Sequence, residues 1–301
     1  LNEAPEFIKS DNPKTKLLFN DSNYRDYLPA RKLKLSVDKE KLIESGCFTS
    51  DEIEKTEDAL YFEINKNHLL RSDLIVLDII ASNNWERPLH FLSPMELRNL
   101  GLDKYLVKEG FAYRLVPYQS PVYNSPYSYQ MNAARTYDLM MQKFRWGNIG
   151  NPDVWLDHTI RRQIEVLGIR RTYAQLAKQM TESGYKQQAV EVLDKCMELL
   201  PFITITNDYY IVRIIALYFD NESNEKGIRR MNEYAEILDD ELCYFASVNT
   251  KFKKDILEAA RNYLYFFNEL LVTARTHQQS DFIEKYQNKF EHHYQYFKSM
   301  N

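Results

Sequence analysis

A nearly uninterrupted apolar run covers residues 74–81, where Asp78 is the one polar side chain. Ser72 stands before the run in a position suited to a helix cap, and Asn83-Asn84 follows it. Asparagine tolerates the left-handed backbone that ends many helices. A helix that is apolar on nearly every side is buried on nearly every side. We therefore predict that residues 72–82 form the central helix of a first domain.

Alternating apolar and polar positions on both sides of this helix predict short strands at 59–65, 87–91 and 111–116. Between the last two strands, residues 95–100 and 103–109 have the pattern of short helices, and each is followed by a glycine. Because strands and helices alternate along the chain, we expect a small α/β unit whose neighbouring strands are parallel.

The N-terminal residues 1–35 are polar and contain three prolines, so we expect an extended arm. A short helix is predicted over 37–44, where Ser45-Gly46 ends it. Thr49 is followed by two acidic residues, which is typical of the start of another helix.

The strongest cluster of helix-breaking residues lies at 146–152, and the predicted domain boundary falls there. A small α/β domain is expected over 36–150 and a helical domain over 151–301, after the arm at 1–35. The predicted fold class is therefore α+β and mostly helical.

The helical domain carries the pattern of one tetratricopeptide repeat. Small residues let two antiparallel helices approach closely, larger residues wedge between them, and a proline ends the second helix. The matching positions are Tyr173, Leu176, Ala177, Met180, Gly184, Ala189, Leu193, Cys196 and Pro201. Two further helix pairs are predicted at 209–238 and 252–298. Repeats of this kind bury a continuous core only when they stack, so we expect about three units.

Composition narrows the choice of partners. The 301 residues carry a net charge of −4, which offers no basic field for nucleic acid. No window approaches the roughly 18 apolar residues that cross a bilayer. The three cysteines have neither metal-ligand spacing nor the even number of a disulfide framework. Because the chain begins at Leu1 rather than at methionine, we expect it to be a piece of a longer protein.

Motifs for known chemistry are absent from the sequence. The six histidines form no HExxH pair, and the adjacent His292 and His293 point to different helix faces. No Walker, dinucleotide-binding or nucleophile-elbow motif occurs, and eight glycines leave little material for phosphate-binding loops. We predict no catalytic residue, no metal and no cofactor in this chain.

Candidate binding residues gather in the stretch 72–117. A buried Asp78 must be paired, hydrogen-bonded or protonated, and two arginines on neighbouring strands are suitable partners. Trp85 either stacks on a sugar or, as such residues do more often, closes the end of the helix. His90 is either a base or, more commonly, a satisfied half-buried side chain. The full candidate set is Asp78, Asn83, Asn84, Trp85, Arg87, His90 and Arg114.

Four local motifs together carry a family resemblance. They are NNWERPLHF at 83–91, GLDKYL at 101–106, EGFAYRLVP at 109–117 and VWLDHT at 154–159. With the repeat that follows, this set resembles the C-terminal soluble part of a bacterial multi-pass membrane protein family of unknown function. That family is similar to protein O-mannosyltransferase-like proteins of the GT-C type that end in a tetratricopeptide-like tail. The resemblance covers most of residues 25–201.

The resemblance implies that the catalytic acids lie in a membrane half upstream, so no catalytic role passes to any residue of this chain. It also implies a place on the extracytoplasmic, periplasmic side of the inner membrane, and a parent protein that is a protein O-glycosyltransferase.

Three functions remain open from the sequence. The first is a non-catalytic extracytoplasmic domain of a membrane-embedded glycosyltransferase-like protein, binding an acceptor protein or partner. The second is a soluble tetratricopeptide adaptor that binds a protein or peptide in its groove. The third is a carbohydrate-binding module centred on Trp85.

Overall fold

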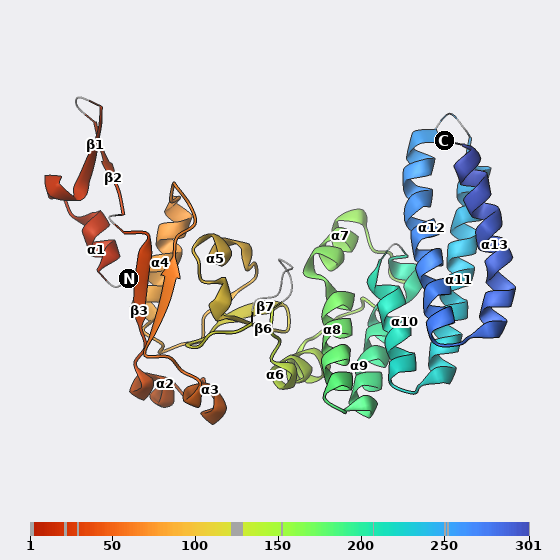
Figure 1. Ribbon diagram of the computed structural model, residues 1–301, viewed down its shortest axis with the longest axis horizontal. Helices are drawn as coiled ribbons and strands as arrows, with labels where there is room; N and C mark the ends of the chain where they lie inside the picture. The colour runs from red at the N-terminus through yellow and green to blue at the C-terminus, as the bar shows by residue number, and fades with distance from the viewer. Residues whose placement is uncertain are drawn as a thin grey trace. The chain divides into compact units, whose positions relative to one another are not determined.

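The structure is a computed structural model that describes residues 3–20, 23–28, 30–121, 129–151, 153–206, 208–249, 251 and 253–300. The chain divides into two compact units, Leu1–Asn132 and Ala133–Asn301. The first unit mixes short helices with short strands, and the second is built from helices (Figure 1). The predicted class, α+β and mostly helical, is confirmed.

The first unit contains five α-helices and seven strands among its described residues. The helices are α1 (Ala4–Lys9), α2 (Lys39–Ser45), α3 (Ser50–Glu54), α4 (Arg71–Asn83) and α5 (Met95–Asn99). The strands are β1 (Lys16–Asn20), β2 (Asn23–Asp26), β3 (Lys32–Ser36), β4 (Ala59–Glu63), β5 (His90–Phe91), β6 (Leu106–Glu109) and β7 (Ala112–Leu115).

The expectation of parallel strands is wrong, because every described strand pair is antiparallel: β1 with β2, β3 with β4, and β5 and β6 on either side of β7. The β6–β7 connection is too short for the crossover that parallel neighbours require. The helix predicted at 103–109 is also wrong beyond its first turn. A 3₁₀ turn at Asp103–Tyr105 leads into β6, and all four residues of β6 are buried.

Local capping chemistry explains the short helices. Thr49 and Glu52 form a capping box at the start of α3, in which each side chain accepts a hydrogen bond from the other residue's backbone N–H. Asp38 accepts from two backbone N–H groups of α2, and Gly46 ends that helix in the left-handed conformation with φ of 61°. Both predicted helix positions are confirmed.

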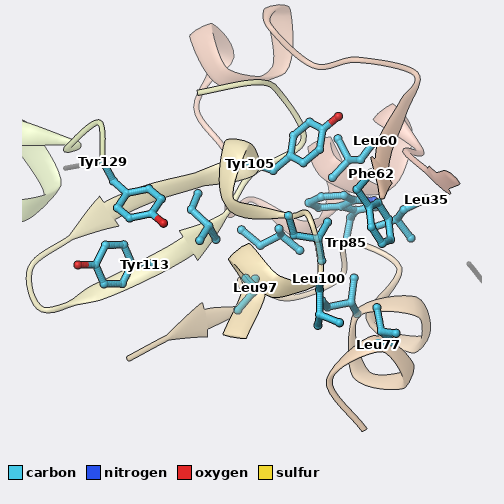
Figure 2. Packing of buried hydrophobic residues seen from close by; sticks show 14 of the residues in the cluster. Leu35, Leu60, Phe62, Leu77, Trp85, Leu97, Leu100, Tyr105, Tyr113 and Tyr129 are labelled. Carbon is cyan, nitrogen blue, oxygen red and sulfur yellow. The ribbon is translucent and has the colours of Figure 1, made fainter. Parts of the chain in front are cut away.

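The core of the first unit lies between α4, the two-stranded β3–β4 sheet and the turn after α5. Figure 2 shows Trp85 among Leu35, Phe62 and Leu100, with Leu77 of α4 alongside. The helix itself is less enclosed than its sequence suggested. Ile75 is 59% exposed and Ile79 is 49% exposed, so α4 is buried on one face only.

The second unit begins with α6 (Ala133–Asp138), which continues as a π-helical turn at Leu139–Lys143. The helices that follow are α7 (His158–Leu167), α8 (Ile169–Glu182), α9 (Lys186–Leu199), α10 (Tyr210–Asp220), α11 (Asn224–Ser247), α12 (Lys253–Thr276) and α13 (Ser280–Ser299). Three antiparallel pairs result, α8 with α9, α10 with α11 and α12 with α13, and α8, α10 and α12 lie in succession (Figure 1).

Small residues allow these pairs to pack closely, as the repeat pattern predicts. Ala177 of α8 and Ala189 of α9 are fully buried. In the next pair, a Cβ on Gly227 of α11 would meet the Phe219 ring of α10 at 2.8 Å, so this position accepts no side chain without repacking.

The division of the chain lies at Asn132/Ala133, whereas the sequence placed a boundary after residue 150. Residues 133–150 pack on the helical unit: the Tyr173 hydroxyl of α8 donates to the Met140 carbonyl at 3.2 Å, and the Tyr173 ring lies against Trp146. The described part of the breaker cluster, residues 146–151, is thus a turn inside the second unit. Of the described helices, none is both long and apolar enough to span a bilayer.

Two glycines of the first unit provide a matched test of backbone packing. Both have positive φ, +77° at Gly101 and +61° at Gly46, but only at Gly101 would a Cβ collide, 2.1 Å from the Glu63 carbonyl oxygen. Gly46→Ala is expected to destabilise by about 1 kcal/mol through backbone strain alone. Gly101→Ala adds a clash with backbone and is expected to cost about 3 kcal/mol. Urea denaturation measures both, and equal losses would contradict the close approach.

Candidate functional site

Asp78 is not the buried acid that its apolar neighbours suggested. Its side chain is 45% exposed and lies 3.7 Å from the Lys9 ammonium of α1. The buried carboxylate of α4 is Asp73, which accepts hydrogen bonds from Lys66 Nζ at 2.7 Å and from the Leu70 backbone N–H at 2.8 Å. The predicted pairing of Asp78 with Arg87 or Arg114 is therefore wrong, because Asp78 lies on the exposed face of the helix.

Trp85 closes the end of α4. It is 4% exposed, and its indole Nε1 donates to the Ser36 carbonyl of β3 at 3.2 Å. Asn84 and Trp85 both have positive φ, 45° and 66°, which turns the chain back across the helix end. Neither face of the indole is open to a sugar, so stacking at Trp85 is excluded in this conformation.

The polar residues on either side of Trp85 stabilise the turn after α4 and do not form a binding site. Asn83 Nδ2 donates to the Arg87 carbonyl at 2.8 Å, and the Arg87 side chain is exposed. Asn83, Asn84 and Arg87 thus stabilise the path of the chain from α4 to β5.

Arg114, by contrast, lies at the centre of a buried ionic network. Its guanidinium pairs with Glu52 of α3 and with Glu109 of β6, the latter at 3.2 Å from Nε to Oε1. Nη1 also donates to the Cys47 carbonyl at 3.1 Å. Sequence reasoning named Arg114 but missed both carboxylates, because Glu52 and Glu109 are ordinary surface residue types until the β-sheet brings them together.

The remaining members of this network are polar groups at its edge. His90 Nε2 lies 3.2 Å from Glu109 Oε2, Asn132 Nδ2 donates to Glu109 Oε1 at 3.3 Å, and the Tyr118 hydroxyl donates to Glu52 Oε1 at 3.2 Å. His90 is therefore neither isolated nor enclosed, with 38% of its side chain exposed.

The Glu109 carboxylate of this network keeps its charge at neutral pH. Burial alone would raise the pKa of Glu109, but the hydrogen bond from His90 and the charge of Arg114 outweigh it and hold that pKa below its ordinary value. Burial and the neighbouring Glu52 carboxylate raise the pKa of the Tyr118 phenol to about 12. The arrangement suits an electrostatic clamp between α3 and the β5–β7–β6 sheet.

A pocket in the first unit has the chemistry for an anionic or hydroxylated ligand. Cationic, imidazole and apolar side chains line it together with one carboxylate. The lining includes Asp26, Arg31, Lys66, His68, Arg71, Tyr27, Leu28, Leu69 and Leu74. Lys66, Asn67 and His68 come from the β4–α4 connection, whose polar run was the one signal available in the sequence.

The second unit carries a groove between the first helices of two adjacent pairs, which we name the α8–α10 groove. Basic, acidic, amide, aromatic and aliphatic residues line it. They are Ala174, Gln175, Lys178, Tyr210, Arg213, Ala216, Leu217 and Asp220. The sequence predicted a peptide groove on the repeats but did not identify its residues.

The groove combines positive charge with apolar surface. Arg213 is exposed and has no ion-pair partner among the described residues, and Lys178 makes only an exposed pair with Glu182 at 3.5 Å. At its end, Tyr209 stacks on Tyr265 of α12 with ring centres 6.5 Å apart. Both rings are substantially exposed, 40% and 49%, so apolar and aromatic surface continues from the groove to α12.

Arg170 holds the backbone next to this groove. Its guanidinium is almost fully buried and donates to the carbonyls of Leu200, Pro201 and Ile205, at 3.1, 2.9 and 2.6 Å. It also pairs with Asp208 at 3.3 Å, and Asp208 accepts from the Tyr210 backbone N–H at the start of α10. The connection from α9 to α10 is thereby anchored to α8.

The first unit is similar to a known protein family. Residues 1–134 match the family described as TMEM260-associated domain 2. The function of that family is unknown. The match ends at the start of α6 and so covers the first unit, and no curated protein and no solved structure matches the chain.

The lowered pKa of Glu109 predicts that the free energy of unfolding depends on pH. Because its folded pKa is depressed, its contribution is present above the ordinary glutamate value of about 4.3 and is lost as the pH falls through the lower folded pKa. Glu109→Gln is expected to be less stable than the wild type by about 3 kcal/mol at pH 7. The difference should shrink on acidification, as melting curves at a series of pH values would measure. A difference that stays constant with pH, or that also appears in the exposed control Glu54→Gln, would contradict this role.

Substitution of Arg170 is expected to cause a large loss of folding stability. Arg170→Met leaves three buried carbonyls without their donor and Asp208 without its partner, which is expected to destabilise by about 3–5 kcal/mol. Arg213→Met removes an exposed guanidinium of the same unit and is expected to change stability by less than about 0.5 kcal/mol. Denaturation followed by helical circular dichroism compares the two, and a small effect at Arg170 would contradict the anchoring.

Proposed function

We propose that this chain is a non-catalytic binding module of a membrane-embedded, glycosyltransferase-like protein, where it holds an acceptor protein on the extracytoplasmic side. The α8–α10 groove is the observation that carries the proposal. It is a preformed surface between packed helices, with charged and apolar side chains placed for an extended segment of another protein.

The chemistry of the groove favours an acidic, extended peptide. Lys178 and Arg213 supply positive charge along its sides, and Asp220 supplies the one carboxylate among the lining residues. Ala216 and the ring of Tyr210, both half-buried, supply apolar contact between them. Carboxylates on the ligand would meet the two basic residues, while its apolar side chains would lie over the centre.

One resemblance supports a place in a larger glycosyltransferase-like protein. The motif set from NNWERPLHF to VWLDHT resembles the soluble C-terminal part of O-mannosyltransferase-like membrane proteins. The match of residues 1–134 to a domain named for its association with TMEM260 supports a first unit that is a recurring module rather than a feature of one chain. Substrate acceptors of an O-glycosyltransferase carry serine or threonine hydroxyls, which sets the choice of probe.

The proposal is tested by fluorescence anisotropy with a labelled, extended peptide of glutamate, serine and leucine residues. Binding to the wild-type chain should weaken with added salt, because opposite charges contribute. The double substitution Lys178→Glu and Arg213→Glu is expected to weaken binding at least about tenfold, equivalent to about 1.4 kcal/mol.

A matched control reverses the same charge elsewhere in the second unit, at Lys195 of α9 and Arg229 of α11. These substitutions should leave the affinity unchanged. Equal losses in the groove and control variants would mean that net charge alone drives binding, and the groove would not be the site.

The same groove also suits a peptide-binding adaptor with no link to glycosylation. The two functions differ in what they require of the ligand, because an acceptor must present hydroxyls. A peptide in which every serine is replaced by alanine is expected to bind more weakly if hydroxyl recognition contributes. Equal binding of both peptides would favour the adaptor.

A further inference from the structure

Three metal-ligating side chains meet on the seam between α11 and α13. Asp239 and Cys243 are four residues apart on α11, so they project from the same helix face. His293 of α13 completes the group. One ligand atom from each residue lies within 4.8 Å of the other two. The cluster lies on α11 and α13, whereas the residues of the α8–α10 groove lie on α8 and α10.

The geometry is that of an interhelical site with one open side. His293 is buried, and its Nε2 lies 2.7 Å from Asp239 Oδ1. Asp239 is partly enclosed, with 17% of its side chain exposed, while Cys243 is exposed. Two donors are thus held in place by packing, and the third is free to rotate toward them from the solvent side.

We propose that Asp239, Cys243 and His293 form a site for a transition-metal ion of the zinc class, which joins α11 to α13. Thiolate and imidazole together favour zinc and exclude the oxygen-preferring calcium and magnesium ions. Zinc takes bonds of about 2.0–2.3 Å to such donors, so a small rotation of Cys243 brings its sulfur into range. Three protein ligands leave a fourth position, on the solvent side, for water.

A metal ion at the cluster would replace the lysine ammonium that now pairs with Asp239. The Lys289 ammonium of α13 now lies 2.6 Å from Asp239 Oδ2, and its side chain is 46% exposed. The carboxylate of Asp240 adjoins Cys243 on α11. A divalent ion would replace the lysine on Asp239, and the lysine can turn into solvent at little cost because it is already half exposed.

Metal binding changes the protonation of the ligands. Burial and the neighbouring Asp239 and Asp240 carboxylates raise the pKa of the Cys243 thiol, so without a metal it is protonated at neutral pH. Coordination releases that proton to the buffer. An imidazole binds a metal ion only through a nitrogen that carries no proton, so His293 must present Nε2 in that form.

Cobalt is the direct probe, because Co²⁺ accepts the same ligands as zinc and is coloured. The whole chain, kept reduced with a phosphine, would be titrated with Co²⁺ and then with Zn²⁺. We expect one ion per chain, a sulfur-to-cobalt charge-transfer band in the near ultraviolet, and loss of the colour when zinc displaces cobalt. Zinc should also raise the melting temperature.

Substitutions separate this site from chance binding. Cys243→Ser changes an exposed residue, so it should fold normally, lose the charge-transfer band and bind at least about tenfold more weakly. His293→Gln should weaken binding by a similar factor, with its fold checked by circular dichroism. His292→Gln, the adjacent exposed histidine, and Cys47→Ser should bind as the wild type does.

Two results would overturn the assignment. One is the absence of a charge-transfer band in the folded, reduced wild-type chain at millimolar cobalt. The other is affinity that Cys243→Ser leaves intact, or that His292→Gln lowers as much as His293→Gln does, since both would indicate adventitious surface binding.

Discussion

Burial of the Arg170 guanidinium is the constraint on which the second unit depends. A charge withdrawn from water must recover its hydration from protein groups, and here three backbone carbonyls and the Asp208 carboxylate do so. Those carbonyls belong to the end of α9 and the connection after it. Asp208 also accepts from the Tyr210 backbone N–H at the start of α10, so one side chain of α8 determines where the next helix pair begins.

The binding surface follows from that constraint. Because α10 starts from a point anchored to α8, the two helices lie side by side with Lys178 and Arg213 on the walls of one groove. A groove between packed helices is largely preformed, so a ligand loses less free energy to ordering of the protein when it binds. Arg114 has the same physical role in the first unit, where it joins α3 to the β6–β7 hairpin through Glu52 and Glu109.

Much of the fold could be predicted from apolar spacing and capping chemistry. The helix pairs of the second unit and the helices that begin after Asp38 and Thr49 follow from local sequence, and they are confirmed. The pattern failed where burial depends on distant partners. Ile75 and Ile79 of α4 are exposed although their neighbours are apolar, and β6 resembles a helix until its four residues pair with β7.

The candidate site was less accessible from sequence than the fold. Asp78, the acid that seemed most unusual, is exposed, whereas the buried acids Asp73, Glu52 and Glu109 have unremarkable sequence neighbours. Their burial arises from contacts between segments far apart in the chain. The cluster of Asp239, Cys243 and His293 has the same origin, since nothing near Cys243 in sequence indicates a histidine on α13.

The central claim is that the α8–α10 groove is the surface that binds an acidic segment of another protein. Methyl-resolved NMR of the alanine and leucine side chains, during titration with the acidic peptide, tests it most directly. The account predicts shifts concentrated at Ala174, Ala216 and Leu217, with the buried methyls of Ala189 and Leu193 unchanged. Shifts spread evenly over the chain, or centred on residues of the first unit, would contradict it.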